Sequence, residues 1–100
     1  MPEPLGLFVV ASSFRVPGLG VLALPAAPTP GWLATCALHT AVAVTLLAEG
    51  HSPTALTGTA EELTHDGQPP RRALLLDFDP GGPLVSGTRL QIEAILPSLF

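Results

Sequence analysis

The sequence contains no lysine, asparagine or tyrosine, and charged residues make up only 12% of its 100 positions. That fraction is about half the average for soluble domains. A P-loop for nucleotide phosphates requires a lysine, so the sequence excludes one. The four arginines face eight acidic residues, which leaves a net charge of -4. This balance disfavours binding to nucleic acid or to an anionic membrane, because phosphate binding relies on many cationic contacts.

Cysteine and long uninterrupted apolar runs are also scarce. A single Cys36 excludes an internal disulfide framework and fits a reducing compartment, so we expect a cytoplasmic protein. No positive charge precedes the first apolar residues, which argues against a secretory signal. Prolines and glycines interrupt the first half of the uncharged stretch 16–48. Its second half, 33–48, is shorter than the ~20 residues of a membrane-spanning helix, so we expect no membrane segment.

What the chain does contain is a series of short apolar segments separated by turn residues. Hydrophobic residues make up 47% of the sequence. Val42, Val44 and Leu46 alternate with smaller residues, which is typical of a strand. Segment 33–38 fits either a helical turn or a short strand. We predict strands at 5–10, 21–24, 41–47, 55–63 and 73–78, and a last strand that follows a short polar break, "SGT", within 84–92. Many short strands with turns between them indicate an all-β sandwich or barrel.

The stretch "PGLG", Pro17 to Gly20, raises the question of whether its glycines hold a phosphate. Phosphate-binding glycine loops lie between a strand and a helix, and no such pattern surrounds this stretch. Proline and glycine at this density turn the chain. We therefore predict that Gly18 and Gly20 shape a hairpin. Gly58, inside the predicted strand 55–63, indicates a bulge or a close approach of another segment.

Three segments, in order, resemble the second domain of elongation factor Tu and related translational GTPases. They are "FRVPGLGVLALP" at 14–25, "LTGTAEEL" at 56–63 and "ALLLDFDPGGPLVSGTRL" at 73–90. The resemblance spans nearly the whole chain and implies a closed six-stranded antiparallel barrel. We therefore expect one domain, 1–100, with a barrel over about 5–92 and an apolar tail at 93–100. The acidic residues with which that family's barrel helps to hold the end of tRNA are replaced by Ala11 and Ser12.

Candidate catalytic and metal-binding residues are few. Cys36 and His39, with His51 and His65, are residue types that bind zinc, but their spacing matches no standard zinc motif. A nucleophile–base pair of Cys36 and His39 would need a third, orienting group. We expect a buried thiol with histidines in surface loops, no metal, no cofactor and no enzymatic activity.

The charged residues mostly fit a solvated surface. Glu61 and Glu62 are adjacent on a predicted strand and therefore point to opposite faces. Asp77 and Asp79 flank Phe78, and they mark the solvent side if Phe78 faces the core. The doublet Arg71–Arg72 is the only pair of adjacent cations, and it is a candidate contact for an anion or a partner.

Apolar residues near the end of the chain, together with one tryptophan, are the candidate interface. They are Trp32, Ile95, Leu96, Leu99 and Phe100. The tail either covers an open end of the barrel or contacts a second molecule, because exposed apolar patches mark contacts. We predict a non-enzymatic binding module for a protein partner or for a second copy of itself. The alternatives are an RNA- or ribosome-associated accessory, which the acidic charge disfavours, and a small enzyme or metal protein centred on Cys36.

Overall fold

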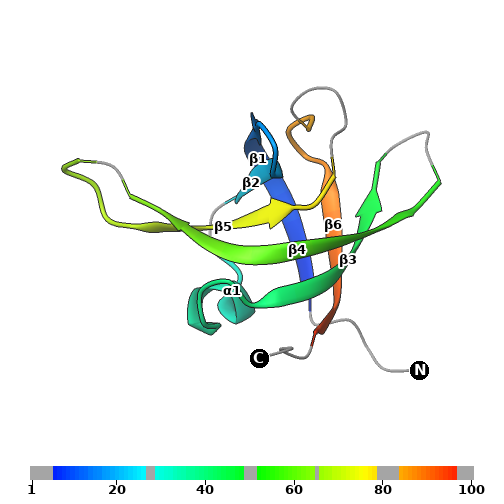
Figure 1. The fold of residues 1–100 in the computed structure, drawn as a ribbon. Helices are drawn as coiled ribbons and strands as arrows, with labels where there is room; N and C mark the ends of the chain where they lie inside the picture. Colours follow the sequence, from blue (N-terminus) through cyan, green and yellow to red (C-terminus); the bar gives the residue numbers. More distant parts are fainter. Residues whose placement is uncertain (1–5, 27–28, 49–51, 65, 79–83, 97–100) are drawn as a thin grey trace.

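Six antiparallel strands close into a barrel in the order β1-β2-β5-β4-β3-β6 (Figure 1). The computed structural model describes residues 6–26, 29–48, 52–64, 66–78 and 84–96. The elements are β1 (Gly6–Val16), β2 (Gly20–Pro25), α1 (Gly31–Thr35), β3 (Ala41–Leu47), β4 (Thr54–Leu63), β5 (Arg71–Leu76) and β6 (Arg89–Ile95). The predicted all-β fold and closed six-stranded barrel are confirmed.

Two strands extend further than the sequence pattern predicted. β1 continues past Val10 to Val16, with a register shift between Val10 and Ser12 that marks a bulge. β6 ends at Ile95, whereas we expected it to end at Ile92. Its last residues stay in the sheet because Ile95 pairs with Val42 and the Leu96 N–H donates to the Ala41 carbonyl. The first part of the predicted tail is therefore barrel wall.

The barrel interior is filled from all six strands and from α1. The fully buried side chains include Phe8, Leu74, Leu76, Leu90 and Ile92. The ambiguous segment 33–38 begins inside the five-residue helix α1, whose Leu33 is 0% exposed and packs into the same core. No helix in the described ranges has the length and apolarity needed to span a membrane.

Gly58 lies where another strand passes close by, as predicted. A Cβ on Gly58 would lie 3.0 Å from the side chain of Leu74 on β5. A larger residue there would have to displace that fully buried leucine.

Two hairpins give the barrel its outline. In Figure 1 the β4–β5 ribbon projects far to one side, and β1 bends over at the top of the barrel, so that the β1–β2 turn returns to the end of β5. The two share a junction, because β2 pairs with β5 only at 21–23 against 74–76. Beyond this contact β5 continues in pairing with β4 alone, up to Arg71 opposite Leu63.

Candidate functional site

Strand β2 is buried on both of its faces. Val21 and Ala23 point into the barrel and are 0% exposed. Leu22 and Leu24 point outward, because successive side chains of a strand alternate between faces. Even so, they are only 6% and 8% exposed. The outer face of β2 therefore carries apolar contacts of its own.

These contacts form a second apolar cluster, separate from the barrel core, which we call the outer apolar cluster. Its members are Val16, Leu22, Leu24, Leu63, Ala73 and Leu75. It spans four strands, and Leu22 lies directly opposite Leu75 across the β2–β5 pair. Its centre is sealed within the chain, since Ala73 is 0% exposed.

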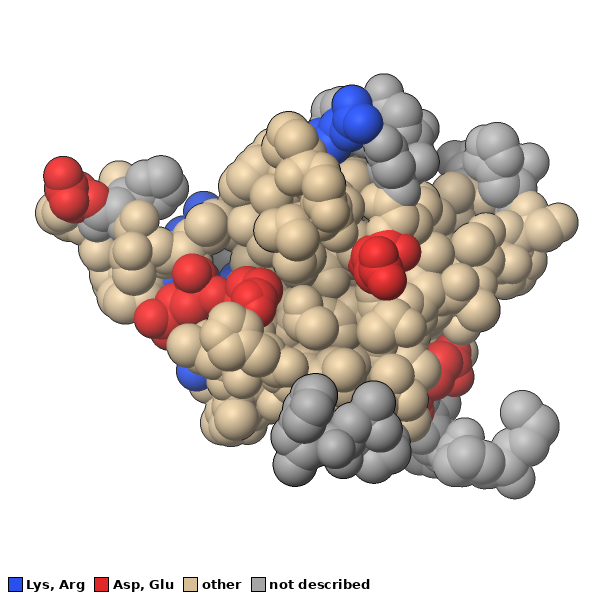
Figure 2. Space-filling model, in the orientation of Figure 1, with Lys and Arg blue, Asp and Glu red and all other residues tan. Residues whose placement is uncertain are grey.

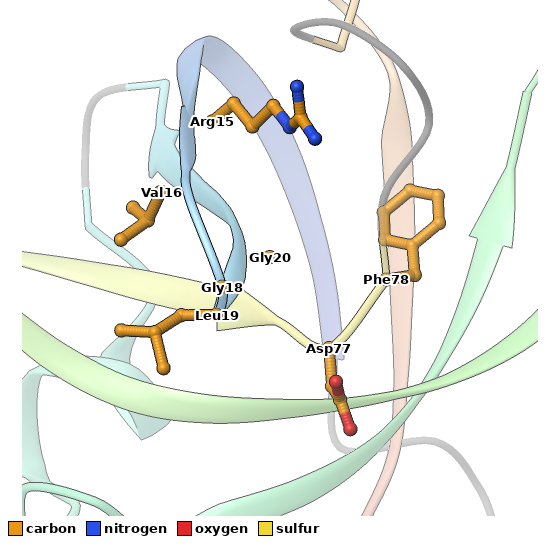
Figure 3. Close-up of a pocket in the computed structure, with 7 residues that line it drawn as sticks. All are labelled: Arg15, Val16, Gly18, Leu19, Gly20, Asp77 and Phe78. Carbon is orange, nitrogen blue, oxygen red and sulfur yellow. The ribbon is translucent and has the colours of Figure 1, made fainter.

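Exposed apolar side chains border the outer apolar cluster. Phe14 lies opposite Leu22 across the β1–β2 pair and is 44% exposed. Leu19, in the turn that follows β1, is 60% exposed. Its N–H donates to the carbonyl of Val16, and the two side chains point the same way in Figure 3. The apolar surface thus continues from the sealed cluster into solvent, where a partner can cover it.

A small cleft of about 220 Å³ opens beside the β1–β2 turn (Figure 3). It is lined by Arg15, Val16, Gly18, Leu19, Gly20, Asp77 and Phe78. Phe78 packs against the barrel core, as its position between two acidic residues suggested, and Asp77 is exposed. The cleft thus combines apolar walls with one cation and one anion.

The glycines of this turn shape a hairpin, as predicted. Gly18 and Gly20 have φ values of 82° and 135°, in the region that favours glycine. A Cβ on Gly20 would lie 2.0 Å from the carbonyl oxygen of Leu76. This close approach brings the β1–β2 turn against the end of β5, and so builds the wall of the cleft.

The two arginines of the doublet point to opposite faces of β5. Arg72 points to the barrel side, where its guanidinium donates to the Cys36 carbonyl at 3.1 Å and lies 3.6 Å from Glu62. Arg71 points outward opposite Leu63, at the edge of the outer apolar cluster, and is exposed. The doublet is therefore not one basic patch, and Arg71 is the cation that faces a potential partner.

The outer side of β5 carries opposite charges at its two ends. Its outward residues are Arg71, Ala73 and Leu75, by the alternation of the strand. Asp77 is exposed in the bend that follows β5, and it still bonds to β4, because its N–H donates to the Thr57 carbonyl. Within the described residues, neither Arg71 nor Asp77 forms an ion pair. Figure 2 shows that uncharged surface separates the groups of acidic side chains on this side of the molecule.

The residues predicted as an interface lie at the other end of the barrel, near α1. Trp32 is half-buried and packs against the barrel core, and its indole lies 3.4 Å from where a Cβ on Gly6 would be. Its Nε1–H is shielded from solvent and has no acceptor among the residues that the structure describes. Ile95 is 53% exposed at the end of β6, and Leu96 is half-buried. Leu99 and Phe100 lie outside the described residues.

The residues considered for metal or nucleophilic chemistry do not converge in the described ranges. Cys36 is half-buried against the core, and its thiol lies 3.6 Å from the Leu33 carbonyl oxygen. The His39 ring is 80% exposed and pairs with Glu61 at 2.6 Å. No three His, Cys, Asp or Glu side chains gather there in a way that could hold a metal ion. His51, His65 and Asp79 lie outside the described residues.

Glu61 and Glu62 separate as their adjacency predicted. Glu61 accepts from the His39 ring at 2.6 and 3.1 Å through its two carboxylate oxygens, while Glu62 faces Arg72. The backbone of His39 has a positive φ of 68°. This hydrogen bond joins the segment between α1 and β3 to Glu61 on β4, and we assign it and the unusual backbone of His39 a structural role.

Comparison with known proteins identified no relative: no family model, no curated protein and no solved structure matches the chain.

The outer apolar cluster is the feature that the sequence analysis did not predict. The sequence signal for burial on both faces of β2 was the uninterrupted apolar run "VLALP", Val21 to Pro25. A strand that alternates polar and apolar residues has one buried face, whereas a strand made of a continuous apolar run has two.

Proposed function

We propose that the chain is a non-enzymatic binding module that recognises a protein through the outer side of β1, β2 and β5. The observation that carries this proposal is the outer apolar cluster, which continues into the exposed side chains of Phe14 and Leu19. Apolar surface of this kind, next to a few charged groups, is the ordinary composition of a protein interface.

The arrangement of charge supports a protein partner over a nucleic acid. Arg71 and Arg15 are cations near this surface, and Asp77 lines the same cleft as Arg15. Binding to a phosphate backbone needs several cations without an anion among them. The resemblance to the second domain of translational GTPases stays a prediction, and it places no functional residue on this surface.

The experiment is affinity capture from the native cell extract with three forms of the chain, read by mass spectrometry. The forms are wild type, Leu19→Asp and Val85→Asp. Leu19 borders the outer apolar cluster, whereas Val85 is 78% exposed in the segment before β6 and serves as the matched control. Because both residues are well exposed, neither change should disturb the core.

We expect a protein that the wild type and Val85→Asp retain and that Leu19→Asp loses. Ribonuclease treatment should leave this capture unchanged. Loss with Ile95→Asp instead would place the interface at the α1 end of the barrel and would overturn the assignment to the outer side. Loss on ribonuclease treatment would favour the RNA-associated alternative.

A further inference from the structure

We infer that the partner on the outer side of β5 is a second copy of this chain, docked with the two β5 strands antiparallel. The inference rests on the proposed function and names the occupant of the same surface. It comes from the order of exposed charges at the two ends of β5, with Arg71 at its start and Asp77 in the bend directly after Leu76.

This order is self-complementary under a two-fold rotation. In an isologous contact, residue i of one copy meets residue j of the other, and j meets i. With the axis near the middle of β5, Arg71 of each copy meets Asp77 of the other, and the half-buried Leu75 residues of the two copies lie near the axis. Ala73 is sealed within each copy and makes no contact across the interface. Two ion pairs then form at opposite ends of an apolar centre, which is the anatomy of a specific interface.

The available charges fit this arrangement. Along the extended strand, Arg71 and Asp77 lie about 20 Å apart, so they cannot neutralise each other within one copy. Both are exposed, and within the described part of the chain neither forms an ion pair. The nearest outward acid on β4, Glu61, is already held by His39.

The apolar margin fits the same contact. Leu63 and Leu75 are half-buried in the outer apolar cluster, and Phe14 and Leu19 keep about half of their surface in water. A second copy on this side would cover that margin and leave the charged ends of β5 paired. A partner of uniform charge would satisfy one end of the strand and oppose the other.

The test is a charge exchange read by sedimentation and light scattering over a range of micromolar concentrations at low salt. The variants are Arg71→Glu, Asp77→Arg, the double variant with both changes, and Arg89→Glu as control. Arg89 is an exposed arginine at the start of β6, away from β5, and its substitution changes the net charge as Arg71→Glu does. Circular dichroism checks that each variant is folded.

We expect the wild type and Arg89→Glu to dimerise alike. Each single change at β5 puts like charges together at both ends, so it should raise the dimer dissociation constant about tenfold or more. The double variant restores opposite charges at both ends and should recover the wild-type constant to within about threefold. High salt should weaken the wild type and remove much of the difference between variants.

A chain that stays monomeric at all concentrations would overturn the inference, and so would a dimer that the exchanges leave unchanged. Failure of the proposed function gives a different result. A monomer that still captures a protein in a Leu19-dependent way would refute the second copy and keep the binding surface. A monomer whose capture does not depend on Leu19 would refute both.

Discussion

Replacing Gly20 with alanine tests how the β1–β2 turn is held against β5. Gly20 has a φ of 135°, which L residues rarely adopt, and its added Cβ would meet the Leu76 carbonyl oxygen at 2.0 Å. That oxygen belongs to the barrel backbone, so no side-chain rotation relieves the overlap.

The expected cost adds two effects. Holding alanine at such a φ costs about 1–3 kcal/mol. Forcing the overlapping backbone apart costs about 1–3 kcal/mol more, by comparison with overpacked cores. We therefore expect Gly20→Ala to lower the free energy of unfolding by about 4 kcal/mol, from a total of about 5–15 kcal/mol. The midpoint of thermal unfolding should fall by about 16–32 °C, since each kcal/mol shifts it by about 4–8 °C in a domain of this size.

Gly18→Ala is the matched control. Gly18 also has a positive φ, 82°, but a Cβ there meets nothing within 4 Å. Only the backbone term remains, about 1–2 kcal/mol. Thermal unfolding followed by circular dichroism should therefore separate the two variants clearly. Equal losses would show that Gly20 matters for its φ alone and that the contact with β5 is unimportant.

Five further substitutions test three individual contacts, each by thermal or urea unfolding. The hydroxyl of Ser13 donates to the Leu84 carbonyl at 3.3 Å and accepts from the Leu84 N–H at 2.7 Å. Ser13→Ala should therefore lower the free energy of unfolding by about 1–2 kcal/mol. No loss of stability would mean that water replaces these two hydrogen bonds. Arg72→Ala should lower the free energy of unfolding by about 1–2 kcal/mol, because it removes the hydrogen bond to the Cys36 carbonyl. Glu62→Gln should lower it by less than about 0.5 kcal/mol, because the ion pair with Arg72 is partly exposed. A larger loss in Glu62→Gln than in Arg72→Ala would contradict this ranking of the two contacts. Trp32→Phe removes a shielded N–H that has no acceptor among the described residues, so it should change the free energy of unfolding by less than about 1 kcal/mol. Trp32→Ala should lower the free energy of unfolding by about 3 kcal/mol. A large loss of stability in Trp32→Phe would reveal an acceptor for the indole.

Most of the barrel could be predicted from the sequence because its strands have local signals. The alternation of Val42 and Val44 with small residues marks β3, and the density of proline and glycine at 17–20 marks the first turn. Both signals act within a few residues, where strand pleating and turn geometry are decided.

The strand ends could not be predicted in the same way, because bulges break the alternation. A register shift between Ala43 and Val44 changes the side to which the last residues of β6 point. Glu93 and Ala94 therefore read as the end of a strand, although the ladder continues to Ile95. The decisive partner, Val42, is distant in sequence, so no local pattern carries this information.

The proposed binding surface could not be predicted from the sequence for a related reason. Arg71 and Arg72 are adjacent in sequence and were considered together, but the strand separates them onto opposite faces. Conversely, Arg71 and Asp77 were considered apart, although they lie at the two ends of the same strand. The relation between Arg71 and Asp77 becomes visible only when β5 is known to bond to β4 as far as the Asp77 N–H.

The scarcity of charge in the sequence follows from the same geometry. The interior of a small barrel is narrow and holds a limited set of side chains. A chain with 47% hydrophobic residues has more apolar side chains than such an interior accepts. The surplus lies on the outer side of β2 and β5, where Leu22 and Leu24 are nearly as well buried as the core. Because charged residues are so few, the exposed Arg71 and Asp77 at the margin of this surface decide the orientation of the proposed dimer, in which the second copy presents the same two charges in reverse order.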